Sequence, residues 1–258
     1  LWGNYLVNLT IDIGNTNIMI CLFSNQKKLK SYIFNTSNLC SKKLLKFLIN
    51  LNLKNKNANI IISSVVPVVT KILADFFKSK KLNFFYARDL IKLFNLKTNM
   101  TNKKKIGDDR LVNILYAKEL FSKSIMVIDF GTATTIDVLD SKGVYDGGII
   151  TPGIDLSLKS LQEGTAKLPL VKFKKIKRVV GKNTMEAIHS GFFWGYISMI
   201  QGLVKKVEIE KKNNFKLIVT GGNAKYFLGA FRNIIKIDEF FNSKALNFIM
   251  NTYLRKMS

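Results

Sequence analysis

The sequence has few of the residues that build cross-linked or metal-centred proteins. Two cysteines, Cys21 and Cys40, cannot form a disulfide scaffold. The single histidine, His189, leaves too few nitrogen and sulfur ligands for a structural zinc site. Nothing near His189 resembles a nucleophile elbow, so we expect it to be a core or interface residue and not a catalyst. Any bound metal would need oxygen ligands, which favours Mg²⁺ or a monovalent cation.

Long apolar runs are also absent. No segment reaches the roughly 18–20 apolar residues of a membrane span, and the closest, residues 59–69, is interrupted by Ser63, Ser64 and Pro67. The first residues do not combine a basic region with a long apolar stretch, so we expect no signal peptide. These features predict a cytoplasmic protein without a membrane partner.

Acidic residues are scarce, and among the basic ones arginine is scarce. The 258 residues carry 41 Lys+Arg against 17 Asp+Glu, a net charge of +24, but only five residues are Arg. Base readout in nucleic acids favours Arg, whereas abundant Lys, Asn and Ile are typical of A+T-rich codons. We therefore expect no nucleic-acid partner, and interpret the densest cluster, Lys172–Arg178, as a solvated loop or strand edge. A nucleic-acid-binding regulator that uses these lysines remains the alternative from another class.

The chain is 47% hydrophobic, enough for a sizeable core. Alternating and continuous apolar runs predict strands at 9–13, 17–23, 30–34, 59–64, 83–86, 125–130, 133–139 and 216–220. Helical spacing predicts helices at 41–51, 68–80, 110–121 and 245–255.

The pattern of strand, tight turn and strand occurs twice. Asp12-x-Gly14 and Asp129-x-Gly131 lie 117 residues apart, and each follows an apolar strand. Such a repeat predicts two similar α/β domains around a cleft. We expect one domain over residues 1–115 and the other over residues 116–258.

Both turns are rich in groups that can hold phosphate. Gly14 allows a close backbone approach, and the following Asn15, Thr16 and Asn17 offer donors; the alternative is an ordinary hairpin. Asp12 could hold hydrated Mg²⁺. The second turn offers the hydroxyls of Thr132, Thr134 and Thr135. A pair of such turns could clamp a di- or triphosphate, and the alternative is chance repetition.

Gly107-Asp-Asp-Arg110 precedes a predicted helix. An aspartate here could simply cap the helix, or a carboxylate base could act with the guanidinium in phosphoryl transfer to an alcohol. Spacing alone does not choose between Asp108 and Asp109. We interpret Gly147–Gly153 and Gly221–Asn223 as flexible turns, the second a candidate to pack against adenine, and Gly191–Gly195 as a buried aromatic helix.

Together these motifs resemble type III pantothenate kinase. The similarity covers, in order, Asp12–Thr16, Ser63–Pro67, Gly107–Arg110, Asp129–Thr135, Gly147–Gly153, Thr165–Pro169, Asn183–Thr184, Ser190–Gly191 and Thr220–Gly222. The family belongs to the superfamily of acetate and sugar kinases, heat-shock chaperones and actin. The resemblance therefore implies two duplicated ribonuclease-H-like α/β domains facing a central cleft, and ATP-dependent phosphorylation of pantothenate to 4'-phosphopantothenate, the first step of coenzyme A biosynthesis. A kinase or phosphatase acting on another small hydroxy acid is the alternative within the superfamily.

The resemblance also implies residue roles. ATP phosphates would be held by Asp12, Ile13, Gly14, Asn15, Thr16, Asn17, Ile18 and Met19, and Thr132 would also contact ATP. Pantothenate would be contacted by Met100, Gly107, Asp108, Asp109, Arg110 and Thr184. Asp109 would be the base and Asp129 would bind K⁺ or NH₄⁺. Thr184 would come from across a homodimer interface or from the second domain.

Two positions depart from the family pattern. Met100, seven residues before Gly107, stands where the family usually has a tyrosine that lines the pantothenate pocket. Methionine is apolar and adaptable but cannot donate the phenol hydrogen bond. The family's C-terminal Leu-x-x-x-Gly-Leu is replaced by Ser243-Lys-Ala-Leu246, which concerns packing.

Overall fold

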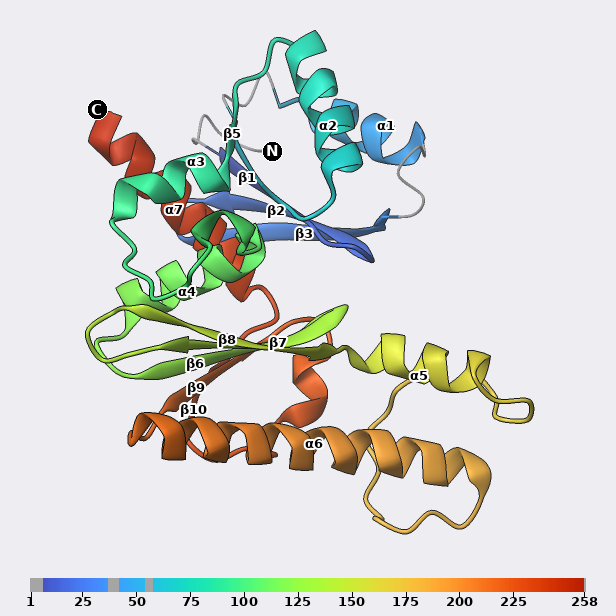
Figure 1. Cartoon of the computed structure of the whole chain (residues 1–258). Coiled ribbons are helices and arrows are strands. Elements are labelled where there is room, and N and C mark those ends of the chain that lie inside the picture. Colours follow the sequence, from blue (N-terminus) through green and yellow to red (C-terminus); the bar gives the residue numbers. More distant parts are fainter. Residues whose placement is uncertain (1–6, 37–41, 54–57, 258) are drawn as a thin grey trace. The chain divides into compact units, whose positions relative to one another are not determined.

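The computed structural model describes residues 7–36, 42–53 and 58–257; Cys40 and Ser41 lie outside this part of the chain. Contacts divide the chain into two compact units, which we call unit 1 (Leu1–Leu120 with Phe240–Ser258) and unit 2 (Phe121–Glu239). Each unit is built on a five-stranded sheet (Figure 1).

Unit 1 has the strand order β3-β2-β1-β4-β5. Its strands are β1 (Val7–Ile13), β2 (Asn17–Ser24), β3 (Lys27–Asn35), β4 (Asn59–Ser64) and β5 (Phe84–Tyr86). Its helices are α1 (Lys42–Asn50), α2 (Pro67–Ser79), α3 (Ala87–Ile91), α4 (Asp108–Leu120) and α7 (Phe241–Met257), with short 3₁₀ turns at Lys92–Phe94 and Lys103–Lys105.

Alternation along β1 explains how helices cover both faces of this sheet. Leu9, Ile11 and Ile13 are fully buried in a core shared with α1 and α2. The intervening Asn8 points toward α7, where its amide donates to Asn247 Oδ1 at 2.8 Å and Asn251 Oδ1 at 2.7 Å. Successive side chains of a strand point to opposite faces. Asp12 therefore lies on the same face of the sheet as Asn8, the face that α7 covers.

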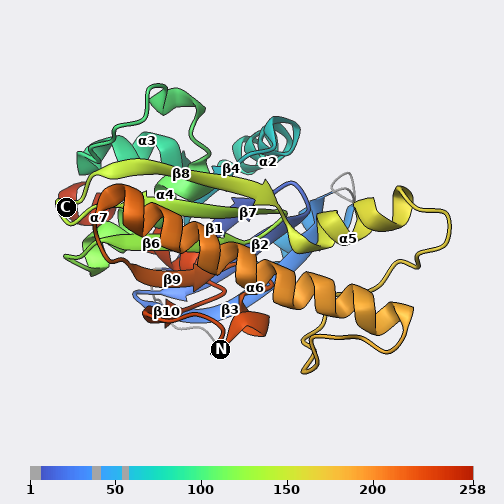
Figure 2. The same ribbon diagram turned by 60° about the horizontal axis from the view of Figure 1, so that its bottom comes forward.

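Unit 2 has the order β10-β9-β6-β7-β8. Its strands are β6 (Ile125–Phe130), β7 (Ala133–Leu139), β8 (Tyr145–Pro152), β9 (Lys216–Thr220) and β10 (Ile234–Ile237). Its helices are α5 (Ile154–Glu163) and α6 (Thr184–Lys211), with a 3₁₀ turn at Ala224–Phe227. The long α6 crosses one face of the sheet (Figure 2), and Phe193 and Ile197 join Met126, Ile128 and Phe130 in the core.

The two sheets are duplicates in topology. In each, the first two strands form an antiparallel hairpin, and the fourth strand lies parallel to the first on its other side. Asp12 lies in register with Met19 and Ser63, and Asp129 lies in register with Thr135 and Thr220. The two aspartates therefore occupy equivalent positions, as the sequence repeat predicted.

The chain differs from the sequence expectation in the strand β8 and in the place of the last helix, among others. The segment expected as a flexible turn at 147–153 belongs largely to strand β8, in which Gly147 has φ +113° and pairs with Val138. The last helix, α7, packs against β1 and β4 of unit 1 instead of joining the second half of the chain. Lys172–Arg178 is an irregular segment and His189 is buried, both as expected. Among the described residues, no helix combines the length and apolar character needed to cross a bilayer.

Candidate active site

The first glycine turn is fixed by neighbouring strands while its tip stays exposed. The Gly14 N–H donates to Asn17 O at 2.9 Å, and the Thr36 hydroxyl donates to Gly14 O at 2.7 Å. Asn15, Thr16 and Asn17 are exposed at the tip. Ile13 and Ile18 are fully buried in the core. Of the predicted phosphate-binding residues, these two could therefore contact a ligand only through their main chain.

The second turn is held by a close approach of Gly153. Its N–H donates to Thr132 O at 3.0 Å, and a Cβ at Gly153 would lie 2.2 Å from Thr132 O and 2.4 Å from Gly131 O. No larger residue fits there without moving the turn. Gly153 thus couples the end of β8 to the turn that exposes Thr132.

Only one of the three threonines in this turn is suited to meet a ligand with its side chain. Thr132 is exposed, but Thr134 is 1% exposed because it shares the buried face of β7 with Ile136. Thr135 points to the other face, where its hydroxyl donates to Asp137 Oδ2 at 3.4 Å. Of the three hydroxyls expected at this turn, that of Thr134 is therefore buried, because side chains alternate along β7; the clamp formed by the two turns stays a prediction.

Space beside the Asp129 carboxylate is kept by Gly221, which follows β9. Gly221 has φ +91°, and a Cβ there would lie 2.4 Å from Asp129 Oδ1. A Cβ at Gly131 would lie 3.5 Å from the same oxygen. Within residues 7–36, 42–53 and 58–257, no three His, Cys, Asp or Glu side chains gather as a metal cluster. The Asp129 carboxylate therefore lies against the main chain of Gly131 and Gly221.

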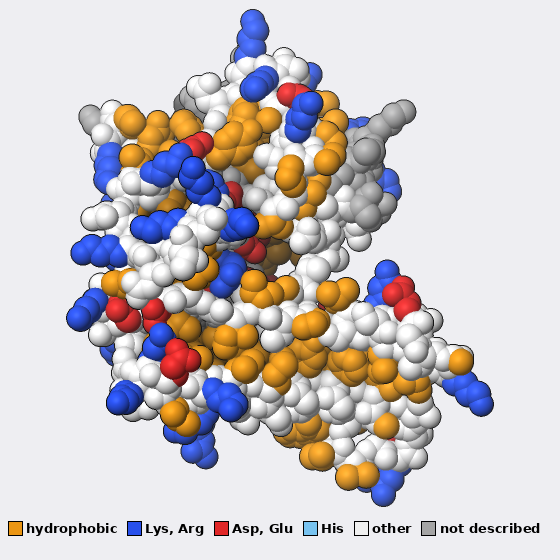
Figure 3. All heavy atoms as spheres, in the orientation of Figure 1, with side chains coloured by type: hydrophobic (Ala, Val, Ile, Leu, Met, Phe, Trp, Pro, Cys, Tyr) orange, Lys and Arg blue, Asp and Glu red, His pale blue; other side chains and the backbone are white. Residues whose placement is uncertain are grey.

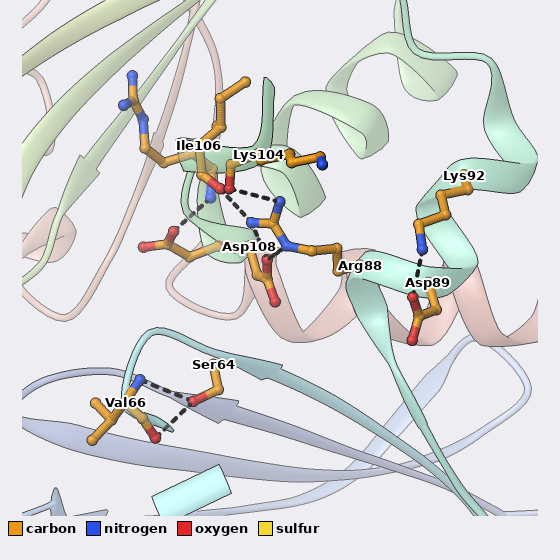
Figure 4. Close-up of polar contacts among 10 residues, drawn as sticks. Ser64, Val66, Arg88, Asp89, Lys92, Lys104, Ile106 and Asp108 are labelled. Atoms are coloured by element: carbon orange, nitrogen blue, oxygen red, sulfur yellow. Dashed lines mark hydrogen bonds and ion pairs between the residues drawn. The ribbon is translucent and has the colours of Figure 1, made fainter. Parts of the chain in front are cut away.

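The segment Gly107–Arg110 gives its two aspartates different surroundings. α4 begins at Asp108, whose carboxylate is bound by Arg88 of α3 (Figure 4). Burial raises the pKa of Asp108, and the Arg88 guanidinium opposes that shift. Asp109 lies against Gly107, where a Cβ would be 2.5 Å from Asp109 Oδ1. This oxygen accepts the Arg110 N–H at 2.8 Å.

The two adjacent carboxylates thus have different neighbours. Asp108 is bound by Arg88 within unit 1, whereas the Asp109 carboxylate packs against the main chain of Gly107, where any side chain would collide with it. The main chain of Asp109 is also held, since Asn242 of α7 donates to Asp109 O at 3.3 Å. Met100, also in unit 1, is half-buried, and its N–H donates to Thr98 Oγ1 at 3.0 Å.

Thr184 lies in unit 2 as the first residue of α6 and is exposed. The preceding Asn183 caps the helix by accepting the Glu186 N–H at 2.9 Å, and the Glu186 carboxylate accepts the Lys182 N–H at 2.9 Å. This reciprocal cap fixes the start of the helix. Thr184 is thereby held at a defined point.

A pocket of about 610 Å³ opens beside Thr184, and sequence reasoning missed it. It lies between β8, α5 and α6, where Figure 3 shows apolar side chains along the surface. Tyr196 spans it, with Oη 2.8 Å from Ser157 Oγ and donating to Pro152 O at 2.9 Å. The sequence does contain a pattern that could have indicated this pocket. One face of a helix is lined, at helical spacing, by Ile188, Gly191, Phe192, Gly195 and Met199. The glycines on that face make room for the pocket.

The chain resembles known proteins over most of its length. The sequence model described as Type III pantothenate kinase matches residues 8–206. A type III pantothenate kinase of Pelagibacter ubique is 41% identical over 239 residues, covering 87% of this chain and 89% of the relative. Among solved structures, a putative Baf family transcriptional activator from Campylobacter jejuni aligns with a TM-score of 0.63 at 22% identity, over 96% of this chain and 99% of its own. A putative N-acetylmannosamine kinase from Listeria monocytogenes aligns with a TM-score of 0.52 at 11% identity, over 98% of this chain and 100% of its own.

The two duplicated α/β domains, each with a glycine turn after its first strand, place the chain in the class of proteins with the actin-like fold. Within that class, the chain belongs to the type III pantothenate kinase family. It is a phosphotransferase that uses ATP to phosphorylate pantothenate, in coenzyme A biosynthesis.

Proposed function

We propose that Asp109 is the general base of this reaction and that Arg110 binds pantothenate. The observation that carries the assignment is the different surroundings of the adjacent carboxylates: Arg88 binds Asp108, while the Asp109 carboxylate lies against the main chain of Gly107. The primary hydroxyl of pantothenate attacks the γ-phosphorus of ATP and the bond to the β–γ bridging oxygen breaks. ADP leaves with that electron pair, and Asp109 accepts the hydroxyl proton. Gly107 and Met100 would border the substrate.

The phosphates of ATP are assigned to the two glycine turns. The exposed tip Asn15–Asn17 offers side-chain and main-chain donors, and Thr132 offers one exposed hydroxyl. Asp12 and Met19, both half-buried, flank the first turn, and Asp12 would hold hydrated Mg²⁺, which neutralises phosphate charge. That the two turns face a common cleft stays a prediction.

The monovalent cation, K⁺ or NH₄⁺, is assigned to Asp129. Its support is the backbone cradle of Gly131 and Gly221 around a single carboxylate. Such an ion would help to neutralise the charge of the transferring phosphoryl group. Rates in K⁺ or NH₄⁺ should exceed those in Na⁺ alone, and equal rates would remove Asp129 from this role.

A homodimer is proposed from the apolar pocket beside Thr184. Thr184, Ile188 and Phe192 lie on one face of α6 that a second copy could cover, which would present Thr184 to the partner's substrate. Thr184→Ala should then raise the pantothenate KM, and mixing it with Asp109→Asn chains should restore part of the activity only if sites are shared. The cytoplasm as the place of reaction stays a prediction.

The assignment of the base is tested with two isosteric variants. ADP release should require pantothenate, and Asp109→Asn should lower kcat about 10²–10⁴-fold, the usual worth of a general base. Asp108→Asn should lose far less. A larger loss in Asp108→Asn than in Asp109→Asn would show that the wrong aspartate was chosen. Salt-sensitive DNA binding without pantothenate turnover would instead favour the regulator.

A further inference from the structure

Arg88 lies outside every motif that the sequence singled out, yet it contacts three points of the segment that leads to Asp109. Its Nε donates to Asp108 Oδ1, and its Nη2 donates to Ile106 O. Its Nη1 donates to Lys104 O at 3.4 Å. Figure 4 shows this guanidinium set between the carboxylate and the two carbonyl groups.

The contacted segment has little regular structure. Between α3 and α4 it has two short 3₁₀ turns and a β-bridge residue at Thr98, and the second turn, Lys103–Lys105, consists of three exposed lysines of like charge. Ile106 alone is anchored by burial, at 2% exposure. The ion pair thus ties α3 to the start of α4.

We propose that Arg88 and Asp108 are positioning residues for phosphoryl transfer, which fix the main chain at 104–108 so that Asp109 and Arg110 keep their orientation toward pantothenate. This inference rests on the roles proposed above for Asp109 and Arg110. Displacing a reacting group by about 1 Å can cost on the order of 10²-fold in rate. Arg88 suits the task because its planar guanidinium holds its N–H donors in a fixed fork, whereas an ammonium group is a compact charge on a flexible chain.

The experiment compares Arg88→Gln, Arg88→Lys and Asp108→Asn with the control Asp89→Asn. Asp89 is the next residue of α3 and forms an exposed pair with Lys92 at 2.7 Å, which Figure 4 also shows. We measure kcat, the KM of each substrate and the urea midpoint. Arg88→Gln should lower kcat/KM for pantothenate about 10–100-fold, while the ATP KM stays unchanged. Asp89→Asn should behave as the unmodified chain.

The conservative variant separates positioning from plain stability. Arg88→Lys keeps the charge beside Asp108, so its urea midpoint should largely recover, but its kcat/KM for pantothenate should not. The double variant Arg88→Gln/Asp108→Asn should be no slower than Arg88→Gln, because residues that act as one unit are not additive. If Arg88→Gln does not fold, Asp108→Asn, which keeps the shape of the side chain, and Arg88→Lys give the kinetic comparison.

Three results would overturn the inference. Unchanged kcat/KM in all folded variants, with Asp109→Asn inactive, would refute positioning by Arg88 and leave the proposed base intact. Full activity of Asp109→Asn would instead refute the base, and with it any positioning through that residue. If kcat/KM falls in proportion to the urea midpoint in every variant, and Arg88→Lys recovers both, Arg88 has only a structural role.

Discussion

Replacing Gly221 with alanine should weaken both the fold and the response to K⁺. Gly221 has φ +91°, and a Cβ there would lie 2.4 Å from Asp129 Oδ1 and 2.6 Å from both C and O of Phe130. Left-handed backbone costs an L residue about 1–2 kcal/mol, and crowding in a packed site costs about 1–3 kcal/mol more. Alanine stiffens the unfolded chain, which offsets about 0.4–1 kcal/mol. We therefore expect a net loss of about 2–4 kcal/mol in unfolding free energy.

Two other glycines of unit 2 serve as matched controls. Gly229 has φ +77° but nothing within 4 Å of a built Cβ, so Gly229→Ala isolates the backbone cost, about 1 kcal/mol. Gly222 has neither a positive φ nor a neighbour within 4 Å. Gly222→Ala should stay within about 0.5 kcal/mol of the unmodified chain.

Urea unfolding followed by circular dichroism gives the three stabilities, and initial rates in K⁺ and in Na⁺ give the cation response. Because the new methyl group would displace the Asp129 carboxylate, the ratio of the two rates should fall in Gly221→Ala alone. Equal destabilisation of Gly221→Ala and Gly229→Ala would refute the crowding. A destabilised Gly221→Ala with an unchanged rate ratio would refute the cation role of Asp129.

Three further variants probe other parts of the chain. Gly107→Ala should push the Asp109 carboxylate aside and lower kcat about 10–100-fold in initial-rate assays; an unchanged kcat would contradict the need for glycine. Burial, and then Lys174, lower the pKa of His189 below 6.5, so the unfolded chain binds the proton more readily and stability should fall as pH drops below 6.5. His189→Gln should reduce the fall of the urea midpoint below pH 6.5. An unchanged fall would show that another group causes it. Tyr145→Phe removes the hydrogen bond to Asp137 Oδ1 at 2.6 Å and should cost about 1.5–3 kcal/mol in urea unfolding without changing kcat.

The strands could be predicted from sequence because their signals are local. β6, β7 and β9 begin and end where the apolar runs predicted. The repeated Asp-x-Gly also predicted the duplication, because both halves have the same sequence pattern where the first strand ends and a tight turn follows. Glycine caused the main error: Gly147 and Gly148 suggested a turn, but they lie in β8, where pairing with β7 outweighs their low strand propensity.

The site could be predicted only in part, because its supporting contacts are distant along the chain. Arg88 meets Asp108 across 20 residues, and Asn242 meets Asp109 across 133. No periodicity encodes such pairs, so the sequence alone could not choose between the two aspartates. The error at Thr134 was avoidable, since its position two residues before Ile136 on β7 already predicts the buried face.

The duplicated position also shows how one scaffold supports two kinds of site. Ser64 follows Ser63, the register partner of Asp12, just as Gly221 follows Thr220, the register partner of Asp129. In unit 1 the Ser64 hydroxyl accepts hydrogen bonds from the Val66 N–H at 3.0 Å and from Thr70 Oγ1 at 2.6 Å. The Ser64 side chain therefore stabilises the chain at the start of α2. In unit 2 the equivalent residue has no side chain, and the space lies against a carboxylate. This difference between the two halves supports the proposal that the monovalent cation binds at Asp129 and not at Asp12.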